Sequence, residues 1–224
     1  MNLVSDAMAW LFAPAQWQGA GALSLLLFQQ LYLTAIPIAI AALIAIPAGW
    51  AIGHTGHGRE IAVAISGAAR AVPSFGLLIL LVLLLGVLHK PVAGGITFVL
   101  LAIPSLLAGA YTGCEAVDRS VIDAARAAGM SEWQILRKVE IPLGLPLLVG
   151  GLRSAVLQVV STVTIAAYVN LGGLGLPIIT GIALQRYDMV LGGSLLVALL
   201  ALALDALLAA IQRAVVPKGV RAAS

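Results

Sequence analysis

Long apolar stretches alternate with short polar connections along almost the whole chain. A bilayer core about 30 Å thick is crossed by about 20 apolar residues in a helix, and five stretches are long enough. These are Leu23 to Ile52, Ile61 to Leu88, Val92 to Tyr111, Leu143 to Val169 and Met189 to Val216. The pattern therefore predicts an all-α integral membrane protein with five transmembrane helices.

Several of these stretches contain proline. In a membrane such prolines predict kinks rather than loops, because neighbouring helices re-satisfy the backbone groups that proline frees. The prolines concerned are Pro37, Pro47, Pro73 and Pro104. Pro73 lies midway along a stretch too long for one straight crossing, so a break in the second helix is expected there.

Two further segments are expected on the outer side of the membrane. Residues 1 to 22 lack the basic start of a cleaved signal peptide and contain Asp6, Trp10 and Trp17. We expect an extracytoplasmic, interfacial helix anchored by tryptophan. The segment from Asn170 to Asp188 is glycine-rich yet apolar, which predicts an outer connection that dips back into the protein.

The composition agrees with a membrane protein and excludes other classes. Charged residues make up 9% of the chain and the mean hydropathy is +1.10, whereas a soluble domain has about 25% charged residues. A net charge of +3 with dispersed basic residues gives no nucleic-acid footprint. Cys114 is the single cysteine, so we expect a small buried thiol rather than a disulfide or a thiol-based metal site.

Lysine and arginine are unevenly divided between the two sets of connections. One set comprises the loop from His54 to Arg59, the segment from Glu115 to Val139 and the tail after Val216, and the opposite set holds only Lys90 and Arg186. The positive-inside rule makes the richer set cytoplasmic, with the N-terminus outside and the tail 218–224 inside. Its basic residues are Arg59, Arg119, Arg126, Arg137, Lys138, Lys218 and Arg221.

A polar segment, residues 115–142, separates the third and fourth crossings. Within Cys114 to Ala128, Val117, Val121, Ala124, Ala125 and Ala128 have the spacing of one helix face. Gly129 is expected to end that helix, and Ser131 with Gln134 forms a capping-box pattern that begins a second short helix. An ordinary helical hairpin at the lipid surface, with its arginines on acidic headgroups, remains open on these grounds.

This segment resembles the signature cytoplasmic loop of ABC importer permeases. That family has Glu-Ala-Ala, three residues, Gly, nine residues and Ile-x-Leu-Pro. The corresponding positions here are Asp123, Ala124, Ala125, Gly129, Val139, Ile141 and Pro142. Asp123 stands where the family has Glu and Val139 where it has Ile, and both exchanges keep charge or shape. The resemblance implies a type I ABC importer permease fold over residues 23–217, with the 115–142 loop, including Arg126, coupling to ATPase subunits.

The same resemblance implies several partners. Two permease subunits, identical or homologous, form the pathway, two ATPase subunits bind the paired loops, and an external binding protein delivers the solute. The partner subunit would bind ATP, because this chain contains no Gly-x4-Gly-Lys-Ser/Thr loop. We therefore expect no enzyme activity and no cofactor in this chain.

Within that family, the nearest likeness is to permeases for the osmoprotectants glycine betaine, choline and carnitine. Four segments carry it: Tyr111 to Gly113, Val139 to Pro142, Gly151 to Ala155 and Gly172 to Gly175. Permeases for methionine or another small solute remain alternatives. A membrane enzyme would need clustered nucleophiles, acids or metal ligands that are not evident, and a membrane scaffold without transport stays open.

Charged side chains inside apolar spans are costly and therefore indicate function. Arg153 and Asp205 lie at comparable depths, about 15 to 18 Å from the cytoplasmic ends of neighbouring crossings. They are expected to form an ion pair, although separate satisfaction by backbone or water is equally compatible with the sequence. Arg70, just before Pro73, is expected to line the passage as part of a gate.

Two histidines, His54 and His57, lie in the first basic connection. Two histidines alone make a weak site, so no metal site is expected. We expect a solvated turn.

Overall fold

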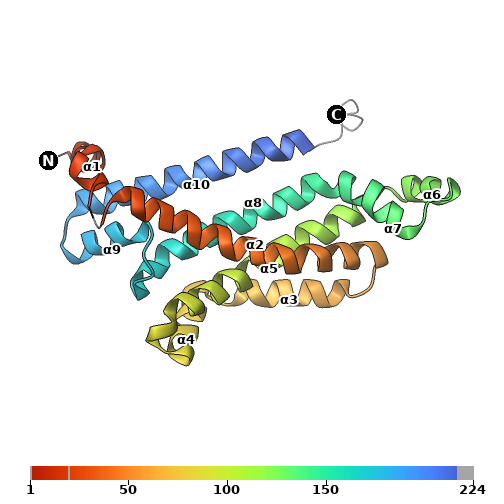
Figure 1. Ribbon diagram of the computed structural model, residues 1–224, viewed down its shortest axis with the longest axis horizontal. Helices are drawn as coiled ribbons and strands as arrows, with labels where there is room; N and C mark the ends of the chain where they lie inside the picture. The colour runs from red at the N-terminus through yellow and green to blue at the C-terminus, as the bar shows by residue number, and fades with distance from the viewer. Residues whose placement is uncertain (1, 20, 216–224) are drawn as a thin grey trace. The chain divides into compact units, whose positions relative to one another are not determined.

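The structure is a computed structural model that describes residues 2–19 and 21–215, without the side chains of residues 65 and 68–70. Every regular element in the described residues is a helix (Figure 1). The chain divides into two compact units. The first contains the residues up to 38, 72–99 and 157–204, and the second contains 39–71, 100–156 and the described residues from 205 onward.

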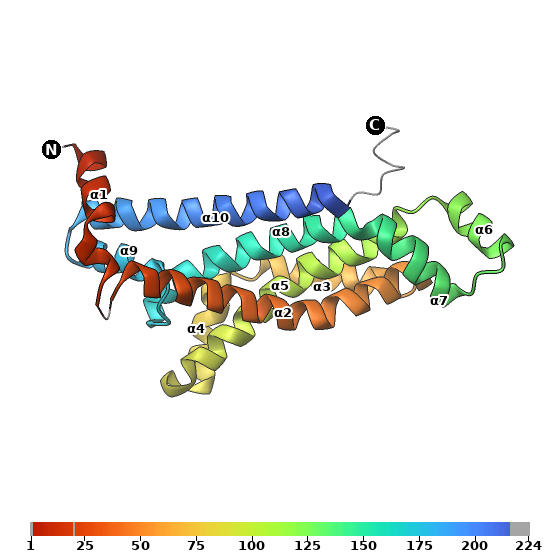
Figure 2. The ribbon, with the colours of Figure 1, turned by 45° about the horizontal axis from the view of Figure 1, so that its top comes forward.

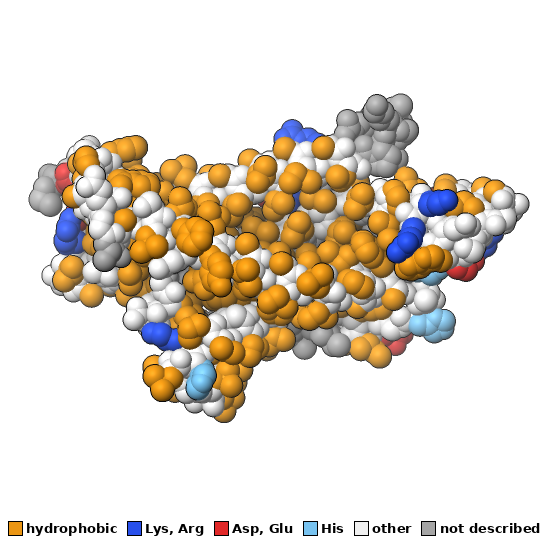
Figure 3. Space-filling model, in the orientation of Figure 1, with side chains coloured by type: hydrophobic (Ala, Val, Ile, Leu, Met, Phe, Trp, Pro, Cys, Tyr) orange, Lys and Arg blue, Asp and Glu red, His pale blue; other side chains and the backbone are white. Residues whose placement is uncertain are grey.

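Among the described helices, four are long and apolar enough to cross a membrane. They are α2 (Leu23–Thr55), α5 (Lys90–Glu115), α8 (Ile141–Ala166, extended by the short helix η4, Ala167–Val169) and α10 (Tyr187–Val215). Pro37, Pro47 and Pro104 lie within continuous helix, so the prediction that they do not form loops is confirmed. Apolar side chains cover much of the visible surface of these helices, as lipid contact requires (Figure 3).

The predicted second crossing consists of two shorter helices, so the count of five is not confirmed. These are α3 (Arg59–Ala71) and α4 (Ser74–Leu85), followed by the single turn η2 (Val87–His89). Pro73 has extended backbone, with ψ of 118°, and lacks an N–H, so the helix stops before it as predicted. The chain also passes from one compact unit to the other at this break.

The first unit has a core built around an N-terminal tryptophan. Helix α1 (Leu3–Phe12) buries Trp10 against Leu23, Leu26 and Leu174. A Cβ atom at Gly192 would lie 2.5 Å from the indole, so the missing side chain makes room for the ring. Trp10 is therefore a core residue of the first unit, and the interfacial position of residues 1–22 stays a prediction. In the following turn, η1 (Pro14–Trp17), the Trp17 indole nitrogen donates to the Leu11 carbonyl oxygen at 2.7 Å.

Two glutamines of α2 hold the glycine-rich segment of the first unit. The Gln29 side-chain oxygen accepts from the Gly173 N–H, and that of Gln30 accepts from the Leu174 N–H, both at 3.1 Å. The buried Gln30 amide also donates to the Val160 carbonyl oxygen at 3.0 Å. The chain then forms α9 (Gly175–Ala183). Some residues of α9 are buried, as expected for a segment that dips back into the protein.

Close approach of α5 and α8 shapes the second unit. A Cβ atom at Gly113 would lie 2.8 Å from the Gly144 carbonyl oxygen, and one at Gly109 would lie 3.0 Å from the Gly151 Cα. Figures 1 and 2 both show the two helices side by side. Small residues at such crossings let membrane helices pack backbone to backbone. Cys114, near the end of α5, is a buried free thiol as predicted.

Candidate functional site

The 115–142 loop belongs to the second unit and contains α6 (Arg119–Ala127), α7 (Glu132–Ile135) and one π-helical turn, η3 (Leu136–Glu140). The predicted single helix from Cys114 to Ala128 is wrong, because α5 ends at Glu115 and α6 begins at Arg119. Asp118 is the cause: its carboxylate accepts from the Ser120 N–H at 2.9 Å and so caps a new helix. The same hydrogen bonding holds the pKa of Asp118 below its ordinary value.

The buried face of α6 differs from the predicted one. Ile122 and Ala125 pack with Val117 and with Ile135 of α7, whereas three residues predicted on that face are exposed. The exposed residues are Val121, Ala124 and Ala128. Because α6 begins anew at the Asp118 cap, its rotation does not follow from that of α5.

The turn between α6 and α7 confirms the predicted signals. Gly129 has φ of +81°, and the Met130 N–H donates to the Ala125 carbonyl oxygen at 3.1 Å, which together close a Schellman turn. The Ser131 hydroxyl accepts from the Gln134 N–H, and the Gln134 side chain accepts from the Ser131 N–H. The sequence therefore dictates a compact pair of short helices.

Charged side chains join the two short helices instead of projecting freely. Arg126 donates to both carboxylate oxygens of Glu132, at 2.8 and 3.1 Å, across the turn. These hydrogen bonds and the negative charge of Glu132 raise the pKa of Arg126. The Arg137 guanidinium lies 4.3 Å from the centre of the exposed Trp133 ring, a cation–π contact.

The residues predicted to couple to the ATPase fall into two groups. One group is exposed and borders the turn: Asp123, Ala124, Arg126 and Gly129. The other joins the loop to the protein: Ala125 is buried, while Val139, Ile141 and Pro142 are half-buried. The motif therefore presents a small-residue surface on a firmly packed base.

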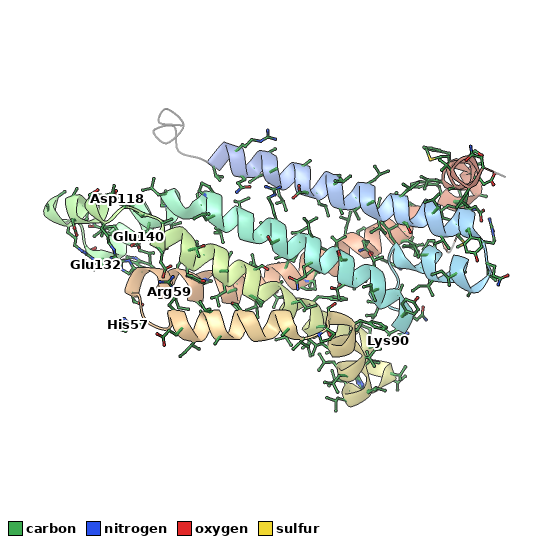
Figure 4. All side chains as sticks on the ribbon, turned by 180° about the vertical axis from the view of Figure 1, so that it is seen from behind. His57, Arg59, Lys90, Asp118, Glu132 and Glu140 are labelled. Carbon is green, nitrogen blue, oxygen red and sulfur yellow. The ribbon has the colours of Figure 1, made fainter. Side chains whose placement is uncertain are left out.

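Sequence reasoning missed a histidine–carboxylate cluster at the base of the loop. His54, in the last turn of α2, has Nδ1 2.6 Å from a carboxylate oxygen of Glu140, and its Nε2 lies 3.6 Å from Glu132. Both carboxylates lie at this end of the second unit, near Arg59 and His57 (Figure 4). The prediction of a solvated turn is correct for His57 and wrong for His54. No local sequence signal marks this pair, because Glu140 follows Arg137 and Lys138 in a stretch that is already charged.

The predicted pair of intramembrane charges is present. Arg153 donates through Nε and Nη2 to the two carboxylate oxygens of Asp205, each at 2.9 Å. Its Nη1 donates to the Gln212 side-chain oxygen at 2.9 Å, and the Gln212 amide donates to the Pro146 carbonyl oxygen at 2.8 Å. The two side chains therefore bind each other, and the alternative in which backbone or water satisfies each charge separately does not hold in the structure. The side chain of Arg70 lies outside the described residues, as do Lys218, Arg221 and the tail 218–224.

Comparison with known proteins identifies one family. The model of the family described as binding-protein-dependent transport system inner membrane component matches residues 41–219. The osmoprotectant import permease protein OsmW of Salmonella typhimurium is 37% identical over 210 residues, which cover 90% of this chain and 95% of the relative. The glycine betaine/carnitine/choline transport system permease protein OpuCB of Bacillus subtilis is 29% identical over 193 residues, covering 86% and 88%.

Solved structures show the same fold. A chain of the inward facing MetNI methionine ABC transporter superposes with a TM-score of 0.75 at 21% identity, covering 90% of this chain and 98% of the other. At that identity the likeness establishes the fold alone. The predicted fold class is thereby confirmed, with four long apolar helices in place of the five predicted crossings.

Proposed function

This chain belongs to the family of inner membrane components of binding-protein-dependent transport systems, and from that premise we propose that it is the permease subunit of an ATP-driven importer for quaternary ammonium osmoprotectants. Glycine betaine, choline and carnitine are the solutes named for its relatives. The observation that carries the solute class is the similarity, over most of the chain, to OpuCB, which is named for glycine betaine, carnitine and choline, and to the osmoprotectant permease OsmW.

The 115–142 loop is the proposed docking element for the ATPase partner. Its exposed surface combines small residues, such as Ala124, with the aromatic ring of Trp133. Small side chains let a partner groove approach the backbone closely, and a partly rigid aromatic ring supplies contact area. The Arg126–Glu132 pair and the Schellman turn give this surface a fixed shape before the partner binds.

We assign the loop to the cytoplasmic side because ATP is hydrolysed there and because the loop belongs to the set of connections that is richer in basic residues. The N-terminus is then outside and the C-terminus inside. A second permease subunit completes the pathway, and an external binding protein supplies the solute. Arg70, Pro73, Arg153 and Asp205 are proposed to shape that pathway.

A methionine permease is the alternative function. The observation behind it is the fold similarity to MetNI, which accompanies a lower sequence identity than that of the osmoprotectant relatives.

Competition for uptake separates the two. Vesicles containing the complete complex with its own binding protein should accumulate radiolabelled choline or glycine betaine. Unlabelled members of that solute class should inhibit the accumulation, and methionine should not. Uptake of methionine that quaternary ammonium solutes leave unchanged would contradict the proposed solute class.

A further inference from the structure

His54 links the end of a long helix to a carboxylate that water hardly reaches. The Glu140 side chain is only 5% exposed, and its carboxylate oxygen lies 2.6 Å from His54 Nδ1. A buried carboxylate needs a hydrogen-bond donor or a cation, because desolvation strongly disfavours an isolated charge. In the described part of the chain, His54 is the side chain that supplies this donor to Glu140.

The second ring nitrogen of His54 faces the start of α7, in the middle of the loop. Nε2 lies 3.6 Å from a carboxylate oxygen of Glu132, and Glu132 is held in a two-pronged hydrogen bond by Arg126. The imidazole of His54 therefore joins α2 to two points of the loop: it contacts Glu140 directly, and it lies near Glu132, which Arg126 of α6 holds.

Glu140 also ends the π-helical turn η3 (Leu136–Glu140), which connects the loop to α8. The backbone N–H of Ile141 donates to the Leu136 carbonyl oxygen, the wider spacing of a π turn. Such turns are rare and occur frequently at functional sites. The contact with His54 holds this irregular turn against α2.

From this geometry we infer that His54 is a positioning residue: its hydrogen bond to Glu140 transmits movement of the 115–142 loop to α2. The inference rests on the proposed function, in which an ATPase partner moves that loop. His54 makes no contact with ATP or solute in this account, and it acts through Glu140.

Two substitutions at one position distinguish the hydrogen bond from general packing. His54→Ala removes both ring nitrogens, whereas His54→Asn keeps one N–H donor attached to Cγ, where Nδ1 is attached in histidine. The matched control is His57→Ala, which alters an exposed histidine in the same turn whose ring contacts the Thr55 carbonyl oxygen.

The measurement is the number of ATP molecules hydrolysed per glycine betaine molecule taken up by the complete complex in vesicles. The amount of ATPase subunit that co-purifies is determined alongside. His54→Ala should raise the ratio by about tenfold or more, the factor expected for one lost hydrogen bond to a charged group. ATPase retention should stay at the unaltered level. His54→Asn should restore most of the coupling, and His57→Ala should match the unaltered complex.

Equal ratios for His54→Ala and the unaltered complex would overturn the inference alone. A His54→Asn complex as uncoupled as His54→Ala would also overturn it, because the hydrogen bond would then not be the cause. If the unaltered complex takes up no glycine betaine, the proposed function fails, and the inference fails with it.

Discussion

Individual polar residues carry much of the specificity in this apolar chain. Arg153 and Asp205 could be predicted to pair from their depth in the sequence, since charges in a membrane span need partners. Gln212 and the Pro146 carbonyl oxygen, which extend the network, could not, because uncharged groups have many possible partners. The same holds for His54 and Glu140, which lie 86 positions apart and give no local signal.

The Arg153–Asp205 pair predicts a charge-reversal rescue. Arg153→Asp and Asp205→Arg should each lower the yield of assembled complex and its Tm, because each places two like charges together inside the bundle. The double exchange should recover part of both losses. Yield after purification and thermal unfolding in detergent measure this effect. A double variant no better than either single variant would show that the pair does not stabilise the protein.

Replacing each of the two glutamines of α2 should lower the unfolding free energy by a different amount. Gln30→Leu removes the acceptor of the buried Leu174 N–H, and an unsatisfied buried donor costs about 1–3 kcal/mol of unfolding free energy. Gln29→Leu removes one hydrogen bond, made by a half-buried residue, and should cost less. Thermal unfolding of the two variants side by side checks the order. A larger loss for Gln29→Leu would contradict it.

Among the helices, the length of the apolar stretches was sufficient to predict four long ones. In the loop, the residues typical of helix ends were sufficient to predict the turn between the two short helices. The long helices α2, α5, α8 and α10 contain most of each predicted span, and Gly129 and Ser131 end and begin helices as expected. The face that α6 buries was not predictable from the sequence. It depends on the new helix start at Asp118, and the apolar spacing around Asp118 is equally compatible with one uninterrupted helix. The position of Trp10 depends on Gly192, which is remote in sequence.

Because Ala124 lies on the exposed surface of α6, a replacement there should affect partner binding without affecting the folding of the loop. Ala124 is exposed, so Ala124→Glu should leave the Tm of the permease unchanged while removing most of the co-purified ATPase subunit. Ala124→Ser, which keeps the side chain small, should retain the partner. Ala125→Glu is less informative, because Ala125 is buried and its replacement disrupts the loop itself. Full ATPase retention by Ala124→Glu would exclude this surface as the docking site.

For the whole molecule, family membership, the apolar helices and the loop indicate one division of labour. In the function proposed above, this chain supplies a pathway and a docking surface, and partner subunits supply solute capture and ATP hydrolysis. The motif in the 115–142 loop pointed to the family directly. The solute class depends instead on similarity spread over the chain, since no solute site is marked by a local motif.

The most direct test is the initial rate of radiolabelled glycine betaine uptake into vesicles that contain the complete complex, with and without ATP on the side of the ATPase subunits. We predict uptake that requires both the external binding protein and hydrolysable ATP. Uptake at the same rate without ATP, or no uptake with every component present, would contradict the account.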